Sequence, residues 1–281
     1  MAQSPALRAV RALALTSSFH HPAIADMAGW EPLSRASAFV VAAGAAASRG
    51  GGVAHHVVMS GHVARPFRFP HYYAPAQFPW MSLLSDEHIR CAVAAAAADT
   101  TDGGGGAGCA AELRERLFVH PTLDVAVGHV ADEPAFLASL HAAGLALQPV
   151  ELLPEPVDEG AALRFEGHVL HGGGGDVRLV PHAVPGWLLA RSGVQTFAAT
   201  SPLVLEMGMC GGPVLRASDG GCAGVIEGVV PSPPAAPPGG GEPPAPESPR
   251  AKAARLLAGA AVMIDATELR AFLRAVERQL S

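Results

Sequence analysis

The run from Gly208 to Pro213 reads GMCGGP and sets three glycines and a proline around a single cysteine. Glycine adopts backbone conformations that a side chain obstructs, so Gly211 and Gly212 predict a tight, closely packed turn. In such a turn the backbone N–H groups of Gly208 and Cys210 can point toward one place and stabilise a developing negative charge. A thiol held beside them can attack a carbonyl group, because cysteine ionises more readily than serine. The run therefore predicts a turn built around a nucleophile.

Two segments upstream offer partners for this cysteine. Residues 55–63 read HHVVMSGHV, an apolar run that ends in two small residues and His62. Residues 120–127 read HPTLDVAV, with Asp124 directly before an apolar stretch. A histidine can serve as general base for the thiol, and a carboxylate can fix its tautomer and stabilise its charged form. That His62, Asp124 and Cys210 are the catalytic residues is what a family resemblance, given next, implies.

In this order, the three segments resemble those that carry the triad of trypsin/chymotrypsin-like peptidases. The nucleophile loop of that family usually reads GDSGGP or GNSGGP, so Cys210 stands where the family has serine. Residues 221–228 resemble the strand that follows the nucleophile and borders the specificity pocket. Residues 257–266 resemble the last barrel strand, ahead of a terminal helix at residues 267–280. The resemblance implies an all-β protein with a chymotrypsin-like double antiparallel β-barrel and a C-terminal helix.

The resemblance also implies a division of the chain. It places a first barrel at residues 31–140 and a second at residues 141–281, which together form one peptidase domain. Residues 231–250 are almost wholly Pro, Gly, Ala, Glu and Ser, a composition that predicts a disordered loop inside the second barrel. Residues 1–30 are left as an N-terminal extension.

The N-terminal extension has two interpretations. It holds Arg8 and Arg11 and no acidic residue before Asp26, a charge pattern similar to that of a mitochondrial targeting segment. A loose tail without a targeting role explains the same residues equally well.

Composition excludes several classes of protein. The chain has 281 residues with 49% hydrophobic content, enough for a substantial core, and its 32 glycines and 25 prolines favour turns over long helices. Its formal net charge of −6 and its lack of a basic cluster give no reason to expect a nucleic-acid partner. No apolar run approaches the length of roughly 20 residues that a membrane-spanning helix needs.

Cysteine and histidine usage favours a reducing compartment and no bound metal. Val63 follows His62 where secreted members of the resembled family usually carry a cysteine, and no disulfide framework is legible. The compartment is therefore predicted to be intracellular, mitochondrial or cytoplasmic.

No C-x-x-C spacing indicates structural zinc. The neighbours His55 and His56 point to opposite faces of a strand, so they cannot share one ion. No cofactor or metal is expected.

An aromatic insert, residues 66–80, follows the histidine segment closely. It holds six of the chain's fifteen aromatic residues together with four prolines. The prolines exclude a regular strand or helix there. The insert either packs on the barrel or forms a surface beside the cleft that binds a substrate or a protein partner.

Four residues are candidates for the substrate pocket. Val204 precedes the nucleophile by six residues and falls near the pocket floor of the resembled family. Glu227, Gly228 and Val229 lie on the strand that borders the pocket. The two valines predict an uncharged pocket. For Glu227, pairing with His62, selection of basic substrates and simple solvation all remain open.

Two functions fit these observations. The first is a peptidase that hydrolyses peptide bonds in peptides or proteins through a Cys-His-Asp triad. The second is a pseudoprotease, a structural or interaction subunit that keeps the shape without the activity. Gly61 and Met209 depart from the usual pattern, and Met209 replaces the aspartate that pairs with the freed N-terminus in trypsin-like zymogens. The sequence therefore predicts a site that forms without proteolytic activation.

Overall fold

The structure is a computed structural model and describes most of the chain. The described residues are 7–24, 27–44, 52–73, 78–95, 109–172, 178–193, 195–201, 204–232, 252 and 255–281. The disordered loop predicted at residues 231–250 lies outside them, apart from residues 231 and 232.

The first half of the molecule is a seven-stranded sheet in the order β6-β5-β2-β3-β4-β8-β7, with every pair antiparallel. The strands are β2 Ala12–Phe19, β3 Glu31–Ala42, β4 His55–Ser60, β5 Ile89–Ala95, β6 Cys109–Glu112, β7 Phe118–Val119 and β8 Val125–Gly128. An isolated bridge between Leu113, just after β6, and Val130, just after β8, connects the two sides of the sheet. The sheet therefore curls back on itself, and one bridge completes the first barrel.

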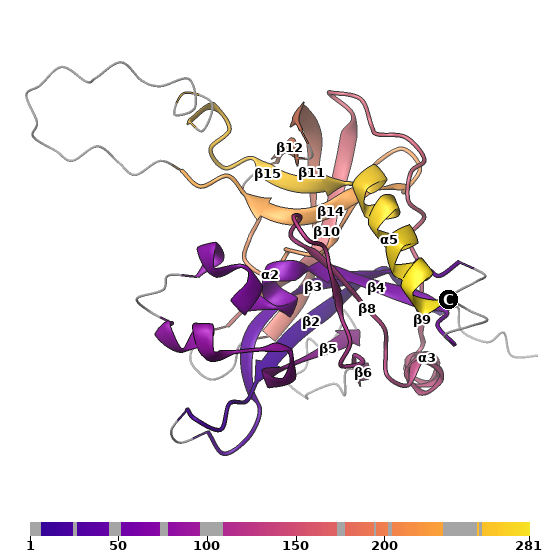
Figure 1. The fold of residues 1–281 in the computed structure, drawn as a ribbon. Coiled ribbons are helices and arrows are strands. Elements are labelled where there is room, and N and C mark those ends of the chain that lie inside the picture. Colours follow the sequence, from indigo (N-terminus) through magenta and orange to yellow (C-terminus); the bar gives the residue numbers. More distant parts are fainter. Residues whose placement is uncertain are drawn as a thin grey trace, which may run out of the picture.

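The second half is a closed barrel in the order β10-β11-β12-β15-β14-β13, again antiparallel throughout. The strands are β10 Ala162–His171, β11 Arg178–Ser192, β12 Gln195–Thr200, β13 Pro213–Arg216, β14 Cys222–Val229 and β15 Ala261–Asp265. Figure 1 shows the two halves one above the other, with the four-residue helix α2 (Gly61–Ala64) close to their boundary. This architecture is a chymotrypsin-like fold, as predicted.

The N-terminal residues depart from the domain limits drawn from the sequence. Residues 12–19, placed there in an extension, form β2, which lies between β3 and β5 in the middle of the first sheet. Leu13 and Leu15 are fully buried in its core. Alternating small and apolar residues suit a half-buried strand. The first segment that carries the resemblance is residues 55–63, and so it gave no reason to place a strand before residue 31. The first sheet therefore starts at Ala12.

Two short elements connect the halves. Helix α3 (Glu133–Ala142) begins where the Asp132 side chain accepts a hydrogen bond from the N–H of Ala135 at 3.0 Å. Strand β9 (Leu145–Leu147) follows and pairs in parallel with β1 (Arg8–Val10), so the N-terminus is tied to the connection between the halves.

The C-terminal helix α5 (Ala266–Leu280) confirms the predicted terminal helix. Asp265 caps it by accepting a hydrogen bond from the N–H of Thr267 at 2.7 Å. Its buried residues recur at helical spacing on one face: Ala266, Leu269, Phe272, Leu273 and Val276. In Figure 1 the helix leaves β15 in the upper half and runs down beside the lower one.

A hydrophobic cluster holds the halves and α5 together. It joins Phe39, Val58 and Val127 of the first sheet to Leu215 and Ile264 of the second barrel, with the apolar face of α5 packed on both. Each half also has a core of its own. None of the described helices is both long enough and apolar enough to cross a bilayer.

Candidate active site

His62 lies on α2, directly after β4, and its ring is held by Asp124. The Nδ1 atom of His62 is 2.6 Å from Oδ2 of Asp124, and the backbone N–H of His62 donates to Oδ1 at 2.6 Å. The Asp124 residue is only 5% exposed and directly precedes β8, which pairs with β4. Because β4 and β8 are neighbours, the ends of the two strands bring imidazole and carboxylate together. The Ser60 hydroxyl supports the pair, 2.7 Å from Nδ1 of His62.

The surroundings of His62 favour its protonated form. Burial lowers its pKa, but hydrogen bonds to Asp124 and to the Cys210 thiol, together with their negative charges, raise it to about 9. The Asp124 carboxylate at Nδ1 and the nearby Cys210 side chain therefore both favour the positively charged form of the imidazole.

The glycines around Cys210 are required by close backbone packing. Gly211 has a φ of +82°, and a Cβ there would lie 2.3 Å from the carbonyl oxygen of Ser37 and 2.7 Å from the Ser60 nitrogen. A Cβ on Gly212 would lie 2.1 Å from the carbonyl oxygen of Glu166. Both contacts are with backbone atoms, which cannot move aside. The loop that carries Cys210 is therefore packed directly against the first sheet at Gly211 and against β10 at Gly212.

Ser37, on β3, holds the loop from the first sheet. Its hydroxyl donates to the carbonyl oxygen of Gly208 at 2.8 Å and accepts from the N–H of His168 at 2.8 Å. Its backbone N–H donates to the carbonyl oxygen of Cys210 at 2.9 Å. Ser37 is fully buried. Two hydrogen bonds from Ser37 thus tie the loop that carries Cys210 to the sheet that carries His62, and a third ties β10 to the same residue.

The backbone N–H groups of Gly208 and Cys210 are left available. Neither donates to an acceptor among the described residues. The carbonyl oxygen of Met207, in the same peptide unit as the Gly208 nitrogen, accepts from the N–H of Leu170 at 3.2 Å. Carbonyl and N–H of one peptide unit point in opposite directions, so the Gly208 N–H is directed away from β10. Two free donors on either side of Met209 fit the requirement for holding an oxyanion.

Met209 occupies an apolar environment inside the second barrel. The residue is fully buried and packs in a cluster with Phe165, Leu163 and Val214. Met209 stands at the position where trypsin-like zymogens carry an ion-pairing aspartate. In this chain the side chain at that position is apolar and lies in the core of the second barrel. The loop is held by the Ser37 hydrogen bonds and by packing.

The aromatic insert, residues 66–80, is packed onto the histidine. Tyr72 stacks on the imidazole of His62 with ring centroids 4.2 Å apart and an interplanar angle of 14°. The hydroxyl of Tyr73 donates to the carbonyl oxygen of His62 at 2.8 Å. Phe69 fills the space beside Gly61, where a Cβ would lie 2.7 Å from its ring. Gly61 departs from the usual pattern of the resembled family, and the structure gives a reason: the glycine leaves room for the insert.

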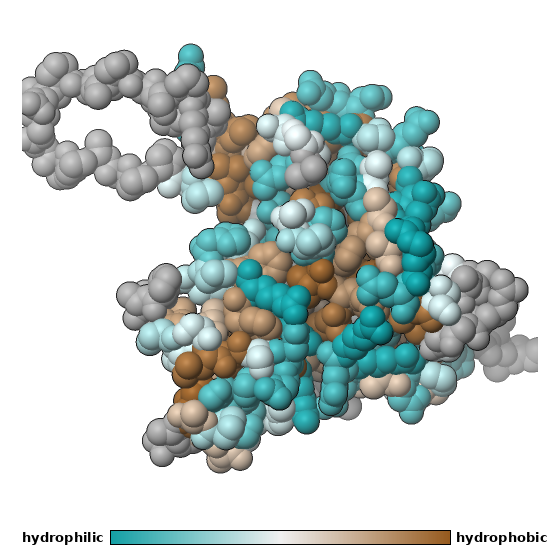
Figure 2. Space-filling view, in the orientation of Figure 1, coloured by the Kyte–Doolittle hydropathy of each residue, from teal (hydrophilic) through white to brown (hydrophobic). Residues whose placement is uncertain are grey.

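The described part of the insert contains only short 3₁₀ helices, as its prolines predict. They are η1 (Pro66–Arg68), η2 (Pro70–Tyr72) and η3 (Pro79–Leu83), and each begins at a proline. Figure 2 shows apolar surface on the lower left of the molecule, in the region of these helices. The exposed large side chains of this segment are Tyr72, Phe78 and Leu83.

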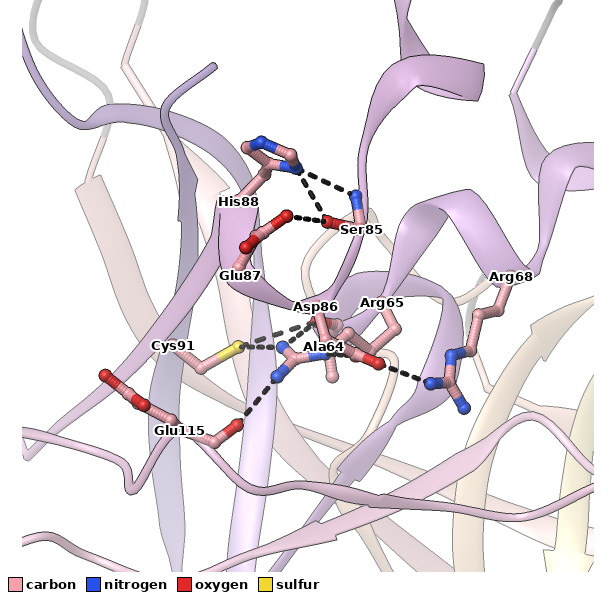
Figure 3. A network of polar contacts seen from close by, with 9 residues as sticks. All are labelled: Ala64, Arg65, Arg68, Ser85, Asp86, Glu87, His88, Cys91 and Glu115. Atoms are coloured by element: carbon pink, nitrogen blue, oxygen red, sulfur yellow. Dashed lines mark hydrogen bonds and ion pairs between the residues drawn. The ribbon is translucent and has the colours of Figure 1, made fainter. Parts of the chain in front are cut away.

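A polar network fixes the base of the insert (Figure 3). Arg65, only 1% exposed, donates to Asp86 at 2.5 Å, to the carbonyl oxygen of Ala64 at 2.9 Å and to that of Glu115 at 3.0 Å. Arg68 reaches the other carboxylate oxygen of Asp86 at 2.6 Å. The two arginines hold the pKa of Asp86 below its usual value although partial burial opposes this. The residues at the start of the insert are therefore clamped to residue 86, beyond its end.

The candidate pocket residues lie along one end of the second barrel. Val204 is 49% exposed and close to Gly259, whose N–H donates to the carbonyl oxygen of Val230, next to Val229. Gly228 has open space where a side chain would be. Val204 thus lies close to the end of β14, which carries Glu227, Gly228 and Val229, and the role of these residues in a pocket stays a prediction.

Glu227 is half-buried and hydrogen-bonded. Its carboxylate accepts from the Tyr72 hydroxyl at 3.4 Å and from the Gln195 side chain at 3.2 Å. Burial and the nearby charge of Asp124 raise the pKa of Glu227. This carboxylate therefore belongs to the surroundings of the triad and is not simply solvated. The link to Tyr72 joins residues 155 positions apart in the sequence, so no local pattern could indicate it.

Within the described residues, no group of three or more His, Cys, Asp and Glu side chains could hold a metal ion. His55 and His56 face different partners: His55 contacts Glu133 at 2.5 Å, whereas His56 contacts His129 at 2.9 Å and Glu277 at 3.2 Å. The four cysteines of the chain are all unpaired.

The strand order, the closed barrel and this grouping of residues define a protein of chymotrypsin-like fold. No protein-family model matches the sequence, and no curated protein matches it either. Among solved structures, the chain is similar to the inactive form of the Rv3671c protease, with 15% identity over 93% of this chain and 87% of that one and a TM-score of 0.46. It is similar also to the active form, from M. tuberculosis, with 13% identity over 98% and 91% and the same TM-score. With likenesses this distant, the fold assignment rests on the topology.

Proposed function

We propose that this chain is a cysteine-nucleophile peptidase, in which Cys210, His62 and Asp124 hydrolyse peptide bonds in peptides or proteins. The observation that carries the proposal is the setting of the His62 ring, whose Nδ1 lies 2.6 Å from the Asp124 carboxylate and whose raised pKa reflects both Asp124 and the nearby Cys210 side chain. A fold alone does not define an activity. This grouping of nucleophile, base and orienting acid does suggest one.

The first half of the proposed reaction forms a thioester. The Cys210 thiolate attacks the carbonyl carbon of the scissile peptide bond, and the carbonyl oxygen becomes an oxyanion held by the N–H groups of Gly208 and Cys210. As the C–N bond breaks, the His62 imidazolium gives its proton to the leaving amine. Asp124 stabilises the charged ring before this transfer and fixes its orientation throughout.

The second half releases the acid. The now neutral His62 takes a proton from water, and the resulting hydroxide attacks the thioester carbonyl carbon. The C–S bond breaks, the carboxylic acid leaves, and Cys210 returns as a thiolate beside protonated His62. No further reactant is needed, so one peptide bond and one water give one carboxylic acid and one amine.

The substrate pocket is proposed to be formed by Val204, Glu227, Gly228 and Val229. The exposed valines favour an uncharged side chain before the cut. The free state of all four cysteines supports a reducing compartment, mitochondrial or cytoplasmic, as the place of action.

Selective alkylation tests the activated thiol. Limited treatment with iodoacetamide should modify Cys210 well before Cys109, a partly exposed cysteine that serves as internal reference. The reaction of Cys210 should slow markedly in His62→Ala, while that of Cys109 stays the same. Equal reaction of both cysteines in the unmodified protein would overturn the proposal.

Cleavage is then tested with a peptide library. The native protein should cut it, and Cys210→Ala should not. Cys222→Ala is the matched control, because this cysteine is fully buried in the second barrel. Activity that survives in Cys210→Ala would contradict the assigned nucleophile.

A second candidate is a non-catalytic interaction subunit that binds a protein through the aromatic insert. The exposed apolar side chain of Phe78 in the insert and that of Leu83, three residues beyond its end, favour it. Changing these two to serine should release a partner and leave Cys210 alkylation intact. Tyr73 and Trp80 are unsuitable for this test, because both pack against the core of the first half. Partner binding that depends on Cys210 and not on the insert would argue against this role.

A further inference from the structure

Tyr72 spans the gap between the two halves of the molecule at the active site. Its ring lies on the imidazole of His62, which belongs to the first half. Its hydroxyl donates to Glu227 on β14, which belongs to the second barrel, at 3.4 Å. Gln195 on β12 donates to the same carboxylate at 3.2 Å and holds it in place. One side chain therefore connects the proposed base to the proposed pocket wall.

The segment that presents Tyr72 is firmly attached. Arg65 and Asp86 clamp the chain on the two sides of the insert. Farther along, Trp80 stacks on Phe19 of β2 with ring centroids 4.7 Å apart and an interplanar angle of 7°. The hydroxyl of Tyr73 is bonded to the backbone of His62. The neighbours of Tyr72 are thus fixed to the first half, while its own ring is 39% exposed.

This position limits what can lie over the histidine. A peptide attacked by Cys210 has its leaving nitrogen next to His62, and successive Cα atoms are about 3.8 Å apart, so residues flanking the cut pass beside the imidazole. The Tyr72 ring already occupies one face of that imidazole. A large substrate side chain would have to displace an aromatic contact and a hydrogen bond to enter this space.

We propose that Tyr72 is a specificity-determining residue that admits only glycine or alanine at the substrate position lying over the face of His62. The inference rests on the proposed peptidase function. The ring acts by occupying space, and its link to Glu227 keeps it over the imidazole. Small residues at that position leave the stack intact, whereas larger ones are rejected.

The first test compares the residues that flank the cut. A proteome-derived peptide library is digested with the native protein, Tyr72→Ala and Tyr72→Phe, and the products are sequenced by mass spectrometry. The native protein should show one position next to the cut restricted to glycine and alanine. Tyr72→Ala should accept leucine and phenylalanine there, and Tyr72→Phe, which keeps the ring, should stay largely restricted. An unchanged preference in Tyr72→Ala would overturn the proposal.

The second test does not depend on peptide cleavage. Cys210 is alkylated with N-ethylmaleimide and, separately, with fluorescein maleimide, which carries the same reactive group on a much larger body. In Tyr72→Ala the rate with the large reagent should rise by about tenfold relative to the small one, as expected for loss of one aromatic contact. Phe78→Ala is the control, because Phe78 is an exposed aromatic of the same insert that packs on Tyr73 and Trp80. In Phe78→Ala the ratio of the alkylation rates with the large and the small reagent should match that of the native protein.

The two tests separate the two proposals. If no peptide is cut but the reagent ratio changes only in Tyr72→Ala, the peptidase function fails and the covering role of Tyr72 stands. If peptides are cut and the ratio is the same in both variants, the function stands and the specificity proposal is overturned.

Discussion

The hydroxyl of Ser37 donates a hydrogen bond to the carbonyl oxygen of Gly208 across the boundary between the two halves of the molecule. Ser37 belongs to the sheet that carries His62, and Gly208 belongs to the loop that carries Cys210. The bond is 2.8 Å long and fully buried, so water does not compete with it. The nucleophile loop is thereby fixed by a contact that needs no processed chain terminus.

Replacing Ser37 by alanine should impair the loop more than it impairs the fold. The variant leaves the carbonyl oxygen of Gly208 and the N–H of His168 unpaired in the interior, at a cost of about 1–3 kcal/mol. We expect a reduced kcat with little change in KM. The control is Ser17→Ala, which removes another fully buried hydroxyl whose 3.5 Å bond to Ser34 stays within the first sheet. Equal loss of kcat in the two variants at equal stability would show that Ser37 has no special role.

Gly211 provides a test of the packing between loop and sheet. Gly211→Ala and Gly220→Ala both put alanine at a positive φ, +82° and +77°, so the backbone strain is similar. The new Cβ meets backbone atoms only at Gly211. At Gly220 the atom nearest to the new Cβ is a side-chain nitrogen of Arg11, 3.9 Å away. Gly211→Ala should therefore lower the unfolding midpoint much further and abolish cleavage. Similar midpoints in urea would refute the packing argument.

The raised pKa of His62 predicts an alkaline limit to both stability and activity. A histidine whose pKa is about 9 in the folded state and about 6.5 unfolded stabilises the fold fully below pH 6.5 and loses that contribution as the pH rises through 9. The difference in unfolding free energy between the native protein and His62→Ala should therefore shrink from pH 6 to pH 10. Cleavage should fall with a midpoint near 9, because the leaving amine then lacks its proton donor.

Direct titration of the His62 imidazole checks the cause of its raised pKa. Proton NMR should place the His62 midpoint near pH 9 in the native protein, and Asp124→Asn should lower it by removing a charge-assisted hydrogen bond. A native midpoint below 7 would mean that the charged ring is not the resting form.

Acid should destabilise the protein through its buried neutral histidines. Burial, with the nearby charges of His56 and Arg114, lowers the pKa of His129 to about 4. A histidine with a lowered pKa supports the fold above pH 6.5 and loses that support as the pH falls toward 4. His129→Gln should be less stable at pH 7, but its urea midpoint should drop less between pH 7 and pH 5. The exposed His141→Gln should follow the native protein, and equal slopes in all three would contradict this explanation.

The pairing of His62 with Asp124 and the tight turn at Cys210 could be predicted from the sequence, because each lies in a short segment with local constraints. Gly211 and Gly212 are set by backbone contacts, and Asp124 by its place before a strand. The contacts of Ser37, Tyr72 and Glu227 could not be found in this way. Their partners are far away along the chain, and a serine on a strand looks the same whether its hydroxyl faces a neighbour or a loop 171 residues later. The aromatic composition of the insert left open packing on the barrel or a surface beside the cleft, and it did not indicate which ring would stack on His62.

Helix α5 touches neither Cys210 nor His62 in the described contacts, yet it has a mechanical bearing on the distance between them. It starts from the last strand of the second barrel, and near its end Glu277 accepts from the N–H of Gly44 at 2.7 Å and lies 3.2 Å from Nε2 of His56, both in the first half. The helix therefore acts as a strut that resists rotation of one barrel against the other. Loosening its final turn would remove two contacts that hold the second barrel against the first half of the molecule.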